Sequence, residues 1–378
     1  MSAPAYRGLT WDHPRGYKAL EAAAARLNPA RDGFSLTWDR HPLEGFEERP
    51  IGEQCALYDL VVLDHPHVGE AVAAQCLRPL EDLFTVDEID AWRDEAMGKS
   101  LASYRYAGQH WALPQDAATQ VMAWRRDRLE APPVTWDDVV RLSETGGVVL
   151  SLSGPHAALT FQSICAAHGA RPAADGETFL ERAGARAAWN LLARLAERSP
   201  EALRPLNPIG LLEYMSRHDD VAVCPLVYGY VNYAAGGLVG FADAPRVTAD
   251  GPVGSILGGT GVGVSRWCKV TPQLLDHLRW LMSPDVQRGF IPEHEGQPAL
   301  RGAWRDAAVN ARWGGFYADT YATLDGASLR PRHDGAIAFQ AAASQRIRMG
   351  LDATEPADRV LDDLQALFAR HRPAGAET

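Results

Sequence analysis

The chain has 378 residues, of which 46% are hydrophobic and 22% charged, a length that suits two globular domains better than one. Its formal net charge of -11 argues against a nucleic acid or an anionic membrane as partner, because those surfaces select for excess lysine and arginine. The cysteines lie far apart and include no CxxC pair, so we expect buried thiols in a reducing compartment. They are Cys55, Cys76, Cys165, Cys224 and Cys268.

The first residues, MSAPAYRGLTWDH, contain no basic segment followed by an apolar one, and no cysteine for lipid attachment. No later segment reaches the roughly 20 uninterrupted apolar residues of a membrane span. As the sequence stands we expect a cytoplasmic protein with no membrane insertion. It would be periplasmic if a leader has been removed or the start is misassigned.

Strand and helix patterns alternate at the beginning of the chain. Short apolar strands are expected over 6–11 and 34–38, and apolar positions at helical spacing over 16–27. Residues 58–63 form a continuous apolar run, typical of a strand buried on both faces. This order predicts a doubly wound parallel sheet, in which ligands bind beyond the carboxyl ends of the strands.

Polar side chains follow two of these strands. Trp11, Asp12 and His13 come after the first, and Asp64 and His65 after the third. Asp12 could instead be a helix N-cap, and the histidines could belong to a loop that is merely polar. Both clusters converge on one edge of the predicted sheet, and this favours a binding site.

The pattern of residues 104–129 is typical of a segment that crosses from one domain into another. A polar turn at Gly108 leads into a short apolar strand that Pro114 is expected to end, and a second strand follows over 119–124. Gln115 and Asp116 lie between the two strands. A helix should begin after Thr135, within PPVTWDD, where the threonine can cap it.

The second half continues the alternation. Strands are expected over 148–152 and 221–227, and helices over 159–168, 186–197, 211–218, 336–349 and 358–371. Phe161 and Gln162 lie on the first of these helices. Tyr228 and Tyr230 follow the second strand.

Residues 254–265, GSILGGTGVGVS, predict a glycine-rich strand that carries Gly259 and Thr260. Glycine suits a hinge that changes φ and ψ, or a backbone that closely approaches a ligand. A nucleotide-binding loop is not supported, because 262–264 continues the strand and no helix opens there. A helix over 274–281 then leads to SPDVQ.

In this order the segments resemble the extracellular solute-binding proteins of ABC importers, the group that contains maltose-binding protein. The matching features are the turn and proline of the first crossover, PVTWDD, the glycine-rich second crossover and the SPDVQ helix end. The resemblance implies a periplasmic binding protein type II fold, an α/β class with two lobes, each with a doubly wound mixed sheet. The N-terminal lobe would comprise 1–113 and 258–308, and the C-terminal lobe 114–257 and 309–378.

The resemblance also implies the function. A small polar organic solute, either sugar-like or an amine or carboxylate metabolite, would bind in the interlobe cleft by hinge closure at crossovers near 113–116 and 256–261. The protein would be a monomer that serves an ABC permease. Aromatic faces would pack on the solute, and carboxylates and amides would bind its polar groups, although each residue alone could equally be core or surface. The expected ligand contacts are Trp11, Asp12, His13, Asp64, His65, Gln115, Asp116, Phe161, Gln162, Tyr228, Tyr230, Gly259 and Thr260.

The alternative is a cytoplasmic enzyme or metabolite sensor built on the same fold. The sequence contains no G-x-S-x-G, P-loop or HExxH motif, and His65 and His67 have no third metal ligand nearby in sequence. We therefore expect no metal and no cofactor. Cys224 or Cys165 would be the nucleophile of such an enzyme, but both lie in apolar runs that favour a packing role.

Overall fold

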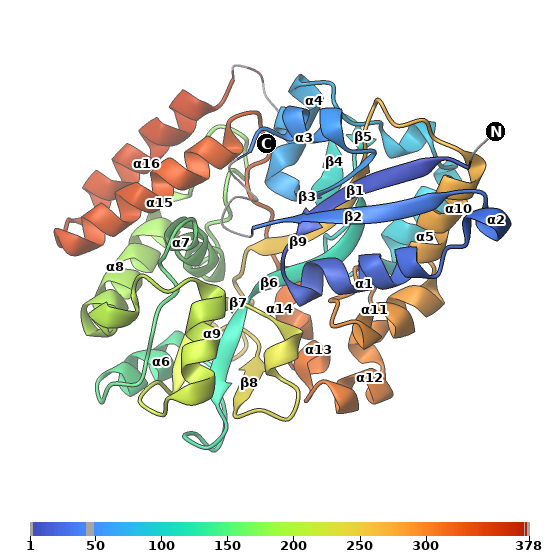
Figure 1. The fold of residues 1–378 in the computed structure, drawn as a ribbon. Coiled ribbons are helices and arrows are strands. Elements are labelled where there is room, and N and C mark those ends of the chain that lie inside the picture. The colour runs from blue at the N-terminus through green and yellow to red at the C-terminus, as the bar shows by residue number, and fades with distance from the viewer. Residues whose placement is uncertain (1–2, 43–48, 374, 376–378) are drawn as a thin grey trace.

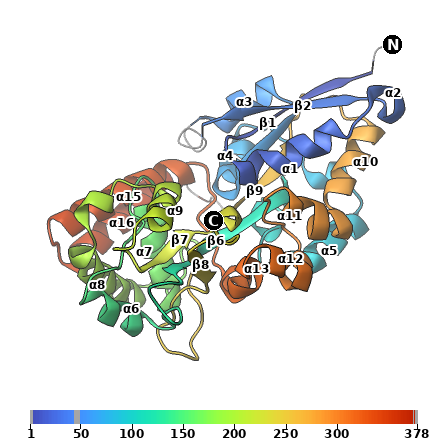
Figure 2. The same ribbon diagram turned by 60° about the horizontal axis from the view of Figure 1, so that its bottom comes forward.

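The computed structural model of the chain describes residues 3–42, 49–373 and 375. It contains two bodies that lie side by side, each built from helices packed on a β-sheet (Figures 1 and 2). We call the body that contains the N-terminal strands the first lobe. The body that contains the C-terminal helix pair is the second lobe. In the part of the chain that the structure describes, no helix has the length and apolar character needed to cross a membrane.

The first lobe is built on a mixed sheet. Strand β1 (Ala5–Trp11) pairs in parallel with β2 (Ser35–His41) and with β3 (Leu60–Asp64), as the alternating pattern predicts. On its other side β3 pairs antiparallel with β9 (Leu257–Val264). Helices α1 (Pro14–Ala25), α2 (Pro29–Asp32) and α3 (Ile51–Leu57) fill the connections between the parallel strands.

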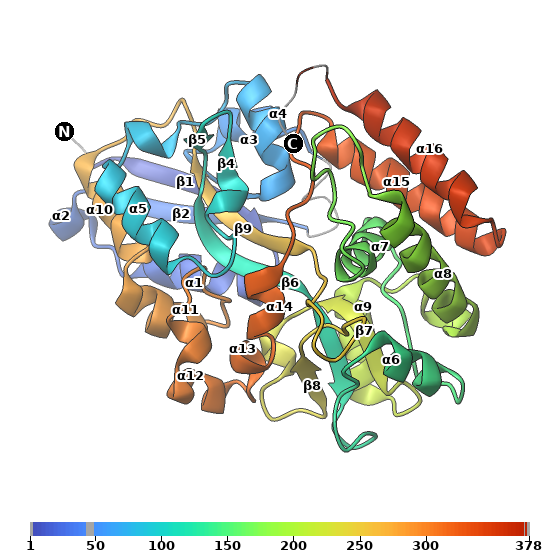
Figure 3. The same cartoon turned by 180° about the vertical axis from the view of Figure 1, so that it is seen from behind.

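One long strand, β6 (Leu113–Arg125), runs from the first lobe into the second (Figure 3). Residues 113–119 pair with β9, and residues 120–125 pair with β7 (Val223–Tyr228) and β8 (Val239–Ala242). The prediction that Pro114 ends a strand is wrong. The register shifts between Pro114 and Asp116, and such an irregularity lets a strand absorb a residue that has no N–H.

The second lobe is mainly helical around β7 and β8. Its core contains Phe161, Trp189, Phe339 and Phe368, all 2% exposed or less. The strand expected over 148–152 is not regular, because Val148 makes only an isolated bridge to Val223. The helices of this lobe are α6 (Trp136–Ser143), α7 (His156–Ala167), α8 (Arg182–Arg198), α9 (Pro208–Arg217), α15 (Ala336–Asp352) and α16 (Ala357–His371).

The remaining elements complete the first lobe and the connection back to the second. Thr135 forms the expected capping box with Asp138 at the start of α6. The limits of the two lobes proposed from the sequence stay a prediction. The elements not yet given are α4 (Val68–Ala73), α5 (Val86–Glu95), β4 (Arg105–Tyr106), β5 (Gln109–His110), α10 (Pro272–Leu281), α11 (Ile291–Glu293), α12 (Ala307–Arg312), α13 (Phe316–Asp319) and α14 (Tyr321–Gly326).

A third connection, residues 327–335, joins α14 to α15 beside the strand pair β6 and β9. The N–H of Leu257 donates to the carbonyl of Ser328 at 2.8 Å, and the N–H of Ser328 donates to Ser255 at 2.9 Å. On the first lobe, the N–H of Gly69 donates to the carbonyl of Arg332 at 2.9 Å. The chain therefore passes between the lobes along β6, β9 and 327–335.

Candidate ligand-binding cleft

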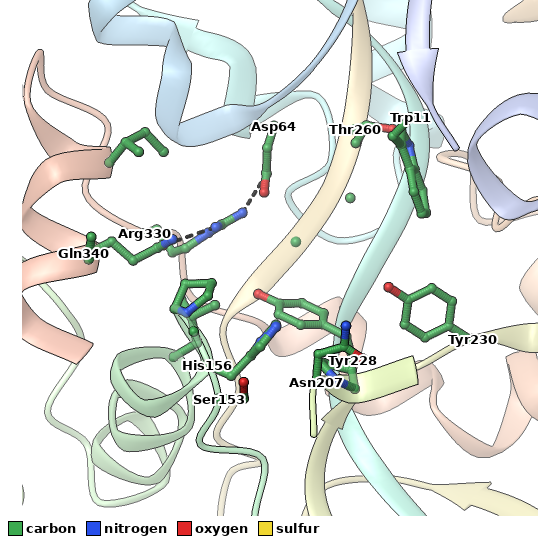
Figure 4. Close-up of a pocket in the computed structure, with 18 of the residues that line it drawn as sticks. Trp11, Asp64, Ser153, His156, Asn207, Tyr228, Tyr230, Thr260, Arg330 and Gln340 are labelled. Carbon is green, nitrogen blue, oxygen red and sulfur yellow. Dashed lines mark hydrogen bonds and ion pairs between the residues drawn. The ribbon is translucent and has the colours of Figure 1, made fainter. Parts of the chain in front are cut away.

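A cavity of about 470 Å³ lies between the two lobes. This volume is within the roughly 300–1,000 Å³ typical of small-molecule sites. The first lobe contributes the ends of β1 and β3 and the start of α1, and strand β9 contributes residues 258–260. The second lobe contributes the loop before α7, the start of α9, the end of β7 and one face of α15 (Figure 4).

An ion pair between Asp64 and Arg330 borders the cavity on one side (Figure 4). Nη2 of Arg330 lies 2.5 Å from Oδ1 of Asp64, and Nη1 donates to Oε1 of Gln340 at 3.2 Å. Burial raises the pKa of Asp64, but Arg330 and His65 outweigh burial and hold that pKa below its ordinary value. Asp64 is thus a carboxylate, able to accept hydrogen bonds from a ligand.

A second buried pair, Arg15 and Asp116, lies at the opposite side. Nη2 of Arg15 is 3.1 Å from Oδ2 of Asp116, and Nη1 donates to the carbonyl of Gly229 at 2.8 Å. The guanidinium also lies over the rings of Trp11 and Tyr230, at 5.0 and 4.4 Å from their centroids. Burial raises the pKa of Asp116 to about 6, against the opposing effect of Arg15. Because Gly229 and Tyr230 follow β7, Arg15 holds the first lobe against the second.

Aromatic rings form much of the remaining wall. The Tyr228 ring lies directly over Gly258, where a Cβ would come within 2.4 Å of the ring. His156 meets the same ring edge to face, with centroids 5.9 Å apart. Burial, followed by the charge of Arg330, lowers the pKa of His156 to about 3, so this imidazole is neutral near pH 7.

A sequence model described as bacterial extracellular solute-binding protein matches residues 56–303. The chain belongs to this family. No curated protein sequence matches the chain.

Solved structures share the fold of this solute-binding protein. Maltose-bound MalE3 of T. maritima is 16% identical, with a TM-score of 0.79 over 97% of this chain and 100% of that one. A ribitol complex from Agrobacterium radiobacter K84 is 21% identical, with a TM-score of 0.76 over 97% and 98%. A D-mannitol complex from Agrobacterium vitis S4 is 15% identical, with a TM-score of 0.73 over 97% and 98%. The expected two-lobed type II fold is confirmed.

Six of the thirteen expected ligand contacts of this solute-binding protein line the cavity. They come from the ends of three strands and from β9, as the argument from strand ends predicts. Whether they bind solute stays a prediction. The six are Trp11, Asp64, Tyr228, Tyr230, Gly259 and Thr260.

Three further expected contacts lie beside the cavity rather than in its lining. Asp12 points to solvent, with 58% of its side chain exposed, and pairs with Arg40 at 3.4 Å. His13 is buried, caps α1 and stacks on Trp11 with ring centroids 5.3 Å apart. Asp116 lies behind Arg15. His13 and Asp116 thus support cavity residues, whereas Asp12 belongs to a surface pair.

The other four expected contacts are buried away from the lining. Phe161 is fully buried and packs edge to face on Trp189, with centroids 6.0 Å apart. Gln162 on the same helix donates back to the carbonyl of Ala158 at 3.2 Å. His65 is fully buried after β3, and Gln115 is 7% exposed within β6. Helix α7 presents its first turn to the cavity, so residues further along it pack inside the lobe.

The sequence reasoning missed most of the second-lobe lining. Loop 153–156 follows the irregular segment 148–152, so the end of that predicted segment was a usable signal. Arg330 and the α15 residues carried no signal, because only the return of the chain along 327–335 brings them to the cavity. Arg15 on α1 and Gly258 on β9 were also missed. The missed residues of the second lobe and of the third connection are Ser153, Gly154, Pro155, His156, Leu159, Asn207, Pro208, Arg330, Ile337, Gln340, Ala341 and Arg348.

The structure also bears on metal and thiol chemistry. Within residues 3–42, 49–373 and 375, no three His, Cys, Asp or Glu side chains form a group that could hold a metal ion. All five cysteines are free and buried. Burial raises the pKa of Cys165 and brings that of Cys224 to about 12, so both thiols stay protonated at neutral pH. Neither thiol lines the cavity.

Proposed function

We propose that the chain binds one small polar organic solute in the interlobe cavity and serves as the substrate-binding component of an ABC-type transport system. The observation that carries this proposal is a single cavity whose stacking rings and hydrogen-bonding groups come from both lobes. Trp11 and Asp64 are on one side, and Tyr228, Asn207 and Ser153 on the other (Figure 4). A solute that touches both sides stabilises the closed arrangement more than an open one.

Sugar-like solutes suit this lining. Aromatic faces pack on the apolar face of a sugar ring or a polyol chain, while carboxylate, hydroxyl and amide groups bind its hydroxyls. The similar structures from T. maritima and the two Agrobacterium species hold maltose, ribitol and D-mannitol. A solute of monosaccharide or disaccharide size, delivered to an ABC permease outside the cytoplasmic membrane, is the function we propose.

The hinge consists of the strand pair β6 and β9 together with 327–335. Gly259 has a φ of +95°, and a Cβ there would lie 2.2 Å from the carbonyl oxygen of Asp116. Only glycine suits that conformation and spacing. Movement about these connections would separate Arg15 from Gly229 while each lobe kept its own core.

We further propose that the solute is bound without turnover. Cys165 and Cys224, the nucleophiles of the enzyme alternative, are buried and protonated, and lie outside the cavity lining. Ligand recovered from the complex and weighed by mass spectrometry should be unchanged. Conversion of the ligand, abolished by thiol alkylation, would instead support an enzyme.

A thermal-shift screen tests the binding proposal. Ligand at about 100 times its Kd should add roughly 2.7 kcal/mol of stability, which raises the melting temperature. Sugars, polyols, amines and carboxylates form the library. A Tyr228→Ala variant, which removes a ring from the cavity wall, should lose the response, whereas Tyr58→Ala, on the first lobe and outside the cavity lining, should keep it. No shift across the library would refute the proposal.

A further inference from the structure

More positively than negatively charged side chains line the cavity. Three arginines, Arg15, Arg330 and Arg348, line it, and Asp64 is the one carboxylate among the described lining residues. Asp116, behind Arg15, and Asp64 offset the first two arginines. No ion pair involves Arg348 within the described part of the chain. Its Nη1 instead donates to the carbonyls of Leu152 and Gly154, at 3.2 and 2.5 Å.

Three helices begin at this cavity. Arg15 lies in the first turn of α1, His156 begins α7, and Asn207 caps α9. The N-terminus of a helix carries a partial positive charge, which acidic residues in the first turn usually offset. None of these three first turns contains an acidic residue, so none of the three partial charges is offset in this way.

The protein leaves part of this positive character unsatisfied. Arg15 is 7% exposed and its buried Nε has no partner. Arg348 lies beside the N-terminus of α7. The N–H groups of His156 and Ala158 there already donate to the carbonyl of Ser153 and to Oγ of Ser344, so what remains for a ligand is the charge of Arg348 and of the helix dipole. The whole chain carries a formal charge of -11, so the sign of the cavity runs against the balance of the sequence. A positive cavity in an acidic protein points to the charge of the bound molecule.

We propose that the solute is a hydroxylated oxyanion, a sugar- or polyol-sized molecule bearing a carboxylate or phosphate group, and this inference rests on the proposed function. The anionic group binds beside Arg348, whose charge no ion pair offsets within the described part of the chain, and near the N-terminus of α7, where the helix dipole favours negative charge. Hydroxyl groups bind Asp64 and Thr260 at the other side. A cationic solute is disfavoured, because Arg330 already pairs with the carboxylate it would need.

Matched ligand pairs test the charge. Binding to the full chain is measured by calorimetry for D-gluconate against D-glucitol and for D-glucuronate against D-glucose, with glucose 6-phosphate and glucosamine as further arms. We expect the anionic member of a pair to bind at least about tenfold more tightly, the gain of one hydrogen bond to a charged group. The carboxylate and phosphate arms distinguish the two oxyanions.

A substitution of Arg348 tests whether this residue causes the preference for an anionic ligand. Arg348→Gln should reduce the preference for the anion over the neutral member about tenfold, whereas Arg359→Gln, the same charge change on α16 outside the cavity, should leave that preference unchanged. If Arg348→Gln does not fold, the salt dependence of wild-type binding decides, because affinity for the anion alone should fall with ionic strength. Equal or tighter binding of the neutral or cationic member would overturn the charge inference and leave the proposed function standing. If no arm and no library compound binds, the proposed function fails and this inference with it.

Discussion

Arg330 and Asp64 join the third interlobe connection to the end of β3 through a 2.5 Å ion pair. Both side chains are buried, at 3% and 8% exposed. The pair lies at the cavity, so the contact that fixes 327–335 on the first lobe also orients a carboxylate of the cavity lining. Under the proposed function, this pair links ligand binding to the position of the hinge.

Breaking this pair should be costly. Arg330→Met leaves Asp64 buried without its partner, for which we expect a loss of about 3–5 kcal/mol in the free energy of unfolding, measured with urea. The double variant Arg330→Met with Asp64→Asn should recover part of the loss, because no charge is left unpaired. Arg182→Met removes the exposed ion pairs of Arg182 with Asp358 and Asp362 and should cost less than about 1 kcal/mol. Equal losses for Arg330→Met and Arg182→Met would contradict this account.

Arg15 should set the balance between closed and open lobes. Arg15→Met removes the hydrogen bond to Gly229 and the contact with the Tyr230 ring, both of which connect the lobes. We expect a larger radius of gyration for the unliganded variant in small-angle X-ray scattering, and weaker ligand binding. Arg40→Met is the matched control, because Arg40 pairs with Glu21 and stacks on Tyr17 within the first lobe. An unchanged radius for Arg15→Met would show that other contacts hold the lobes together.

The first-lobe half of the cleft was readable in the sequence because its signals are local. Apolar runs over 6–11 and 58–63 end in Trp11 and Asp64, and parallel strands bring such ends to one edge of a sheet. The glycine-rich run correctly gave Gly259 and Thr260 on a strand. These inferences needed only periodicity and the geometry of parallel strands.

The second-lobe half depends on tertiary contacts that no local pattern encodes. Arg330 reaches Asp64 across 266 positions of sequence. Phe161 was expected to be an aromatic residue of the cleft. Because α7 packs on α8, its side chain instead lies in the core of the second lobe, against Trp189. Pro114 looked like a strand end, yet an irregularity in the pairing with β9 carries the strand through it. In each case tertiary packing, and not the local pattern, decided the outcome.

Two glycines with positive φ allow the cost of backbone strain to be measured separately from the cost of a steric clash. Gly108 has a φ of +81° and open space where a Cβ would lie, while at Gly259, with a φ of +95°, a Cβ would meet the Asp116 carbonyl at 2.2 Å. We expect Gly108→Ala to cost about 1 kcal/mol. Gly259→Ala should cost clearly more and weaken ligand binding, because β6 and β9 must separate at the hinge. Urea unfolding of both variants measures this, and equal costs would show that the strand pair adapts.

Stability should fall in mild acid because several buried histidines are neutral in the folded protein. Burial lowers the pKa of His13 to about 3, and those of His65, His67, His277 and His333 to about 4, against 6.5 in the unfolded chain. The unfolded chain therefore binds more protons between pH 6.5 and about 4. Stability is lost as pH falls through that window, at up to about 1.4 kcal/mol per pH unit for each histidine.

Protonation of Asp116 has the opposite effect on stability in mild acid. Its folded pKa of about 6 exceeds the ordinary 3.8, so the folded protein binds the extra proton and this group adds stability as pH falls from about 6 to about 4. The stability that this one carboxyl group adds is about equal to the stability that one histidine removes. The net effect of lowering the pH is therefore still a loss of stability. The urea midpoint measured at pH 7, 5.5 and 4.5 should fall at each step. A midpoint that stayed level would mean that these imidazoles are protonated in the folded state.

His277→Phe isolates one histidine from the set. The ring of His277 packs between Phe34 and Trp280, at centroid distances of 5.9 and 5.8 Å, and its buried Nε2 has no partner. A phenylalanine keeps the ring contacts and cannot take up a proton, so the variant should match the wild type or exceed it at pH 7. Below pH 6.5 its stability should decline less steeply, by up to about 1.4 kcal/mol per pH unit. A parallel pH profile for the two proteins would mean that His277 does not contribute to the acid sensitivity.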